Sequence, residues 1–112
     1  MTYPVYLVFT NAVEGREDEF NDWYDNVHLS DVVKVPGIVS GTRFKLSDVQ
    51  RSDVPFKYKY AAVYQLDTHD IGSVVAELKK RAGTEVMPLS SAMEESRESY
   101  YFEQISSRTR SA

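Results

Sequence analysis

Apolar and polar positions alternate along this chain with two different periods, one typical of strands and one typical of helices. Residues 3–10 form a run of apolar, aromatic and β-branched side chains, which predicts a buried strand that begins the sheet. The runs 38–46 and 58–66 alternate with a period of two, and 98–105 supplies a last strand. In 58–66 the even-numbered residues are the more apolar set, so we expect that face to be buried.

The second predicted strand needs a closer description because it contains a glycine and an arginine. A regular strand would place these residues on one face: Ile38, Ser40, Thr42, Phe44 and Leu46. The other face would then carry Val39, Gly41, Arg43 and Lys45. Glycine inside a strand indicates a bulge or a close approach of another group.

Two stretches have the spacing of an amphipathic helix. Residues 14–28 carry one apolar stripe at i, i+3, i+4, i+7 and i+8: Phe20, Trp23, Tyr24, Val27 and His28. This helix must end before Pro36, with room for a short extra turn over 31–35. The second helix spans 70–82, with Asp70 as its N-cap and Gly83 as its stop. We also predict a short helical piece around 90–95.

The predicted order is strand, helix, strand, strand, helix, strand, which is the split βαβ arrangement of ferredoxin-like α+β folds. It implies a four-stranded antiparallel sheet with both helices on one face, in a single domain over 1–105. The other face is too apolar to be left in water, so we expect a homodimer. The polar tail 106–112 is then either disordered or laid across the partner.

The composition argues against nucleic-acid-binding, disulfide-bonded and membrane-attached classes of protein. The net charge is -4, and the basic cluster Lys79-Lys80-Arg81 suits a helix C-terminus, so we expect no nucleic-acid partner. The chain has no cysteine, which excludes disulfides and thiolate chemistry. It shows neither a signal peptide nor an 18-residue apolar span, so we expect a cytoplasmic protein without membrane attachment.

His28 is the leading candidate for chemistry, because a neutral imidazole is the commonest general base near pH 7. Tyr24 lies one turn earlier on the same helix face and could exchange a hydrogen bond with the imidazole. Trp23 and Phe20 could form an apolar wall for a flat substrate. Alternatively, His28 ends the helix as a cation favoured by the helix dipole, and its neighbours are core residues.

The strands add weaker candidates. Tyr60 and Tyr64 could line a pocket and offer phenol groups to a substrate oxygen, or they could be ordinary β-forming residues. Arg43 could neutralise a carboxylate or an enolate, although a surface arginine is the simpler interpretation. His69 with Asp70, and His28 with its neighbouring acids, do not provide three convergent ligands, so we expect no metal site.

The motif Phe20-x-x-Trp23-Tyr24-x-x-x-His28, followed by Val35-Pro36-Gly37, resembles the dimeric α+β barrel superfamily and particularly its EthD-like branch. The resemblance covers nearly the whole chain. It implies two ferredoxin-like protomers whose sheets face each other, each with a small pocket between sheet and helices. Muconolactone-type members imply an acid or base role for a histidine at the position of His28. EthD-like relatives commonly have a proline where this chain has Ser30.

Three hypotheses follow from the residues and the resemblance. The first is a cofactor-independent enzyme of lyase, isomerase, cyclase or monooxygenase type, acting on a small aromatic or polyketide-like carbonyl compound. His28 would transfer the proton, and Tyr24 would help to hold an enolate oxygen. The second is a non-catalytic dimeric protein that binds a small ligand or assists a catabolic pathway. The third, degradation of heme, requires an axial histidine in a larger cavity and ranks last.

Overall fold

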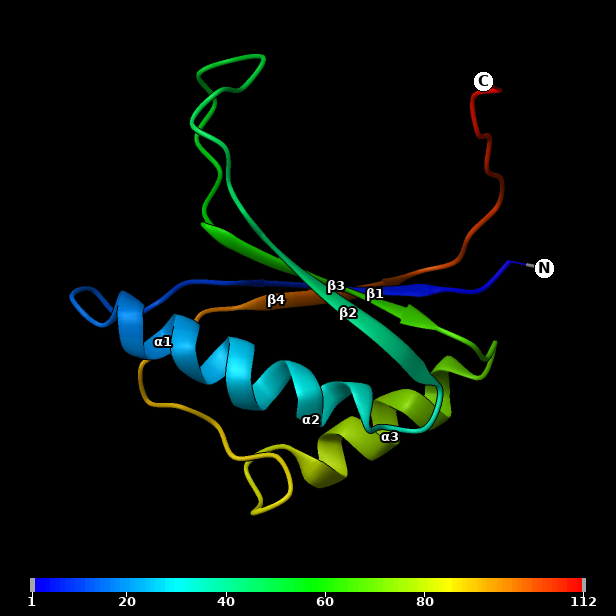
Figure 1. Cartoon of the computed structure of the whole chain (residues 1–112), viewed down its shortest axis with the longest axis horizontal. Helices are drawn as coiled ribbons and strands as arrows, with labels where there is room; N and C mark the ends of the chain where they lie inside the picture. The colour runs from blue at the N-terminus through cyan, green and yellow to red at the C-terminus, as the bar shows by residue number, and fades with distance from the viewer. Residues whose placement is uncertain (1, 112) are drawn as a thin grey trace.

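The computed structural model describes residues 2–111 and confirms the predicted order of elements. The elements are β1 (Val5–Thr10), α1 (Glu17–Trp23), the π-helical segment η1 (Tyr24–His28), α2 (Leu29–Val33), β2 (Ile38–Lys45), β3 (Tyr60–Leu66), α3 (Ile71–Arg81) and β4 (Glu98–Phe102). The strands form one antiparallel sheet in the order β2-β3-β1-β4. The helices lie together on one face of this sheet, as Figure 1 shows. The fold is therefore the predicted ferredoxin-like α+β arrangement.

The core lies between the sheet and the helices. The even-numbered residues of β3 are buried, as predicted, and the odd-numbered ones are half-buried; Tyr64 and Leu66 are each only 1% exposed. Tyr6 of β1 is paired with Tyr64 and lies on this same helix-facing side. Phe20 of α1 and Val74 of α3 are fully buried against the sheet. This packing fixes both helices relative to the strands that position the candidate site.

The first helical region ends before Pro36, as predicted. It continues past His28 through α2, where a short extra turn was expected only over 31–35. The π-helical segment inserts an extra residue into the turn that contains Tyr24 and His28, and such insertions are frequent at functional sites. The chain then turns at Gly37, whose φ of +98° strongly favours glycine.

Strand β2 contains a register shift between Ile38 and Ser40. The predicted regular alternation is therefore wrong from that point onward, because an irregularity of one residue exchanges the two faces. Gly41 now faces the helices, where an added Cβ would lie 2.7 Å from the ring of Tyr64. The predicted close approach at Gly41 is confirmed. Phe44 lies on the opposite face and is 54% exposed.

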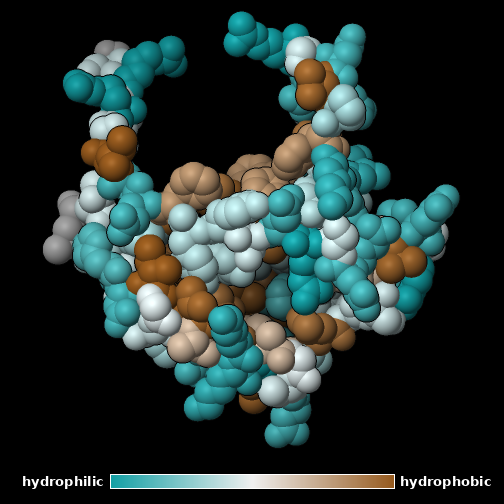
Figure 2. All heavy atoms as spheres, turned by 180° about the vertical axis from the view of Figure 1, so that it is seen from behind, coloured by the Kyte–Doolittle hydropathy of each residue, from teal (hydrophilic) through white to brown (hydrophobic). Residues whose placement is uncertain are grey.

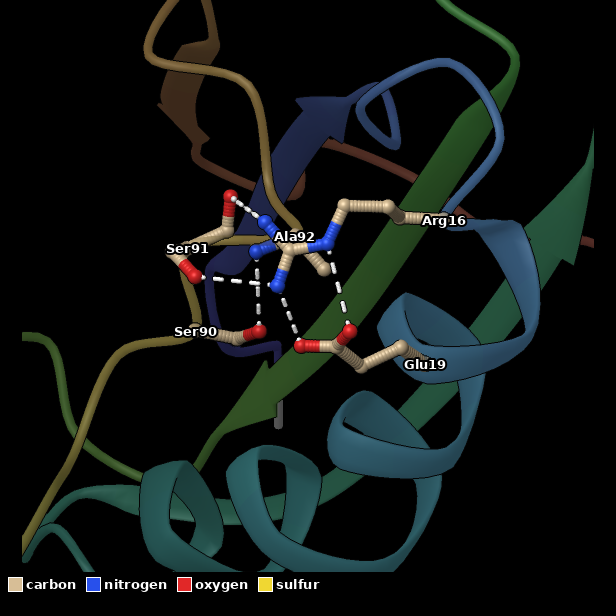
Figure 3. Close-up of polar contacts among 5 residues, drawn as sticks. All are labelled: Arg16, Glu19, Ser90, Ser91 and Ala92. Carbon is tan, nitrogen blue, oxygen red and sulfur yellow. Dashed lines mark hydrogen bonds and ion pairs between the residues drawn. The ribbon is translucent and has the colours of Figure 1, made fainter.

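The segment 90–95 forms turns and a bridge, so the short helix predicted there is wrong. Arg16, at the start of α1, donates hydrogen bonds to the carbonyl oxygen and the hydroxyl of Ser91 and pairs with Glu19 (Figure 3). The amide of Ala92 donates to the Ser90 hydroxyl, which satisfies a backbone group outside any helix. These contacts hold the segment against α1, where it closes one side of the cavity described below.

The open face of the sheet carries exposed apolar side chains. Phe44, Tyr100 and Phe102 are each about half exposed on this face. The loop between β2 and β3 and the chain after β4 extend away on this same side (Figure 1). Figure 2 shows tan and brown side chains at the base of the space between these two arms. No helix within residues 2–111 combines the length and the apolar character needed to cross a membrane.

Candidate functional site

A cavity of about 210 Å³ lies between the sheet and the helices. Its walls come from β1, β3, η1, α2, α3 and the segment that leads to β4. The cavity is mainly aliphatic, and the lining residues that matter for the chemistry are a histidine, three tyrosines and two cations. They are His28, Tyr6, Tyr24, Tyr64, Lys79 and Arg97. Val8, Val32, Leu78, Met87 and Leu89 belong to the aliphatic part.

His28 lies at the end of η1 and lines this cavity, as the helical stripe predicted. Its ring stacks on Trp23 with 4.6 Å between centroids and meets Tyr24 edge-on at 5.0 Å. These two aromatic rings fix the orientation of the imidazole. The buried Nδ1 of His28 has no hydrogen-bond partner among residues 2–111. A buried ring nitrogen without a partner is uncommon in folded proteins and calls for a functional explanation.

Burial is the main cause that lowers the pKa of His28, to about 4, and the positive charge of Arg97 adds to it. The imidazole is therefore neutral at pH 7 and can accept a proton. The alternative interpretation, a histidine cation at a helix C-terminus, does not fit, because α2 continues the helix for 5 residues beyond His28.

Two phenol groups face each other beside the imidazole. The hydroxyl of Tyr64 donates to that of Tyr24 over 3.4 Å, and both side chains are almost completely buried. Burial raises the pKa of Tyr24 and that of Tyr64, so both phenols keep their protons at neutral pH. Because the Tyr64 hydroxyl donates its hydrogen bond to Tyr24, the hydroxyl of Tyr24 is the one that can donate to an oxygen in the cavity.

Tyr6 extends this aromatic wall, although its position in the sequence gave no reason to select it. Its ring stacks on Tyr64 at 5.7 Å and on Tyr101 of β4 at 4.3 Å. Tyr6 is paired with Tyr64 on one side and with Tyr101 on the other. Only the strand pairing, which joins segments far apart in the chain, identifies these residues as neighbours.

Four of the five predicted substrate-binding residues lie outside the cavity, and three of them lie together. Arg43, Phe20 and Tyr60 form a separate cluster, with the guanidinium of Arg43 4.4 Å from the ring centroid of Tyr24. Arg43 also donates hydrogen bonds to Asp25 and Asn21, and its side chain is only 13% exposed. The interpretation of Arg43 as a free surface residue is therefore wrong. The cluster supports Tyr24 from outside the cavity.

Trp23 stacks on the ring of His28 but does not itself line the cavity. Its Nε1 donates to the carbonyl oxygen of Pro88 over 3.1 Å, which ties η1 to the segment after α3. Within the described part of the chain, no group of three or more histidine or acidic side chains is placed to hold a metal ion.

Comparison with known proteins supports the fold. No family model and no curated protein matches the chain. Among solved structures, HapK from Hahella chejuensis has a TM-score of 0.60 at 19% identity, with 100% of both chains covered. An EthD family protein from Bacillus halodurans C-125 has a TM-score of 0.60 at 16% identity, covering 94% of this chain and 100% of that one.

A candidate monooxygenase from Shewanella loihica PV-4 has a TM-score of 0.54 at 16% identity, covering 96% of this chain and 99% of that one. This chain shares its fold with these three proteins, one of which is an EthD family protein. The resemblance inferred from the helical motif and the order of elements is thus confirmed at the level of the fold. At these identities the comparison concerns architecture and leaves the reaction to be argued from the cavity.

Proposed function

We propose that the protein is a cofactor-independent enzyme that transfers a proton next to the carbonyl group of a small aromatic or polyketide-like compound. The observation that carries this proposal is the neutral His28, whose Nδ1 is buried without a partner beside a cavity that also contains two phenols. A base, an O–H donor held in place by a second phenol, and an apolar pocket are groups that favour enolisation.

The chemistry begins with removal of a proton from the carbon next to the carbonyl. The imidazole of His28 takes that proton, and the C–H electron pair moves into the carbonyl group to form an enolate. The hydroxyl of Tyr24 donates a hydrogen bond to the enolate oxygen, while the hydroxyl of Tyr64 donates to Tyr24 over 3.4 Å and orients it. The imidazolium then returns the proton to the same or another carbon. An isomerase, lyase, cyclase or oxygen-dependent monooxygenase can each proceed from this enolate.

The size and lining of the cavity limit the substrate. An engineered apolar cavity of about 150 Å³ is known to hold benzene. The cavity here, about 210 Å³, is therefore suited to one substituted ring or a short chain of similar volume. Its aliphatic residues, such as Val8 and Met87, favour an apolar substrate body.

A second candidate function is ligand binding without turnover, as an accessory protein of a catabolic pathway. The observation in its favour is the pKa of His28 at about 4, because so weak a base is poorly matched to a carbon acid. An anion bound beside His28 would raise that pKa and make the imidazole a stronger base.

A panel of single-ring methyl ketones in D₂O separates the two functions. We expect the protein to accelerate deuterium incorporation at the carbon next to the carbonyl, followed by proton NMR. A ring of equal size without an exchangeable proton should compete with the ketones. Binding without accelerated exchange would favour the accessory function, and absence of both binding and exchange would contradict the proposed enzyme.

We further propose that the protein works in the cytoplasm as a homodimer that pairs the open faces of two sheets. Phe44 and Phe102 expose about half of their surface there, and the loop between β2 and β3 and the chain after β4 extend on the same side (Figure 1).

Light scattering tests the homodimer and should give twice the 12.8 kDa chain mass. Phe44→Lys should give the single mass, because it would bury an unpaired charge. Val86→Lys, at an exposed residue on the helical side, is the matched control; a monomeric wild type would contradict the proposal.

A further inference from the structure

The charged residues at the cavity have the opposite sign to the chain as a whole. The chain has 17 acidic and 13 basic residues, and its net charge is -4. Among the described residues that line the cavity, Lys79 and Arg97 are charged and none is acidic. They come from α3 and from the segment before β4, which are separated by the loop that follows α3. Their convergence is therefore a property of the fold.

These two cations, both exposed at the edge of the cavity, have no acidic partner among the described residues, a property they share with other cations such as Lys80. Arg16, Arg43 and Arg81 each form an ion pair with an acidic side chain. Lys79 and Arg97 form no ion pair within residues 2–111. The C-terminal position in α3 explains why Lys79 is favourable there, but it does not explain Arg97. A guanidinium without an acidic partner at a cavity is suited to a carboxylate.

The charge of Arg97 reaches the buried groups of the site. It lowers the pKa of His28, in addition to the larger effect of burial, and it opposes the rise in the pKa of Tyr24. A ligand anion paired with Arg97 would cancel this effect and would favour the protonated imidazole. The bound anion would thus make His28 a stronger base than it is in the empty cavity.

We propose that the substrate is a carboxylate-bearing carbonyl compound, whose carboxylate pairs with Arg97 and Lys79 at the edge of the cavity. This inference rests on the proposed function and adds the charge class of its substrate. The apolar body would lie against the aliphatic wall, and the carbonyl oxygen would approach Tyr24 and Tyr64. The carboxylate is not changed by the reaction; it serves as an anchor and as the partner of the imidazolium.

Two compounds of nearly equal shape test the inference: 4-acetylbenzoate, an anion, and 4-acetylbenzamide, which is neutral. We expect the anion to bind wild-type protein about 10–100-fold more tightly, because a charge-assisted hydrogen bond replaces a neutral one. Arg97→Gln should remove most of this preference. Lys80→Gln, which alters the neighbouring lysine of α3 outside the cavity lining, should keep it. All six affinities, two compounds with each of three proteins, are measured by calorimetry at one salt concentration.

An independent readout is the titration of the His28 ring followed by NMR. Saturation with 4-acetylbenzoate should raise the pKa of His28, whereas saturation with the amide should not. Equal affinities for the two compounds, or an unchanged preference in Arg97→Gln, would overturn the inference. If the amide still undergoes exchange that depends on His28, the proposed enzyme stands and the carboxylate anchor fails. Exchange of neither compound, despite tight binding of the anion, leaves the anchor and contradicts the enzyme.

Discussion

Replacing His28 with glutamine is expected to slow exchange of the proton next to the carbonyl by about 10²–10⁴-fold, the usual contribution of a positioned general base. Glutamine approximates the polarity and reach of the imidazole but cannot take up a proton near neutral pH. The rate is measured by deuterium incorporation into the ketone that wild-type protein exchanges fastest. Ligand affinity should change only a few-fold, because the aliphatic wall and the Tyr24–Tyr64 pair are untouched.

The matched control is His69→Gln. His69 is the other histidine of the chain, and it packs on Tyr3 at 4.8 Å, away from the residues that line the cavity. We expect this variant to keep the wild-type exchange rate. If His28→Gln unfolds the protein, His28→Asn offers a smaller replacement, and circular dichroism decides which variant is compared. An unchanged rate in a folded His28 variant would rule out His28 as the base.

The elements of the fold could be predicted because each has a local signal. The even face of β3 and the stripe through Phe20, Tyr24 and His28 depend on periodicities of two and about 3.6 residues, which are visible in the sequence. The N-cap of α3 was predicted from Asp70 alone, and its carboxylate accepts from the Ser73 amide. These features do not depend on residues elsewhere in the chain.

The errors occur where a distant contact decides the local structure. The chain around Ser91 has a composition compatible with a helix, but hydrogen bonds to Arg16 and a bridge between Ala12 and Met93 hold it in turns. The register shift in β2 similarly depends on how that strand meets β3. A single sequence does not contain these pairings, so propensity was overridden by tertiary contacts.

The candidate site divides in the same way. His28 and Tyr24 could be found because they are neighbours on one helix. Tyr6 comes from a strand and Arg97 from a loop, and both reach His28 and Tyr24 only in the folded chain. No spacing in the sequence therefore connects Tyr6 or Arg97 to His28. Arg43 was selected for its charge, yet its contacts with Asp25 and the ring of Tyr24 direct it outside the cavity.

The buried histidine should also make the fold sensitive to mild acid. In the unfolded chain His28 takes up a proton below its ordinary pKa of 6.5, whereas in the folded protein it does so only below about 4. Between these values the unfolded state binds more protons, so the free energy of unfolding decreases as the pH falls from 6.5 to 4. A difference of about 2.5 pH units corresponds to a loss of roughly 3 kcal/mol, complete below pH 4.

Urea unfolding of wild type, His28→Gln and His69→Gln between pH 7 and pH 4 measures this loss, at one protein concentration because association also affects stability. We expect His28→Gln to lack most of the decrease and His69→Gln to retain it. Hydrogen bonds from Ser73 and Arg81 lower the pKa values of the Asp70 and Glu77 carboxyls. These two carboxylates therefore lose their contribution to the free energy of unfolding mainly below the range of pH 6.5 to 4. Parallel curves for wild type and His28→Gln would mean that the imidazole is already hydrated in the folded protein. The same burial that keeps His28 neutral would then be absent, and with it the basis for treating His28 as the base.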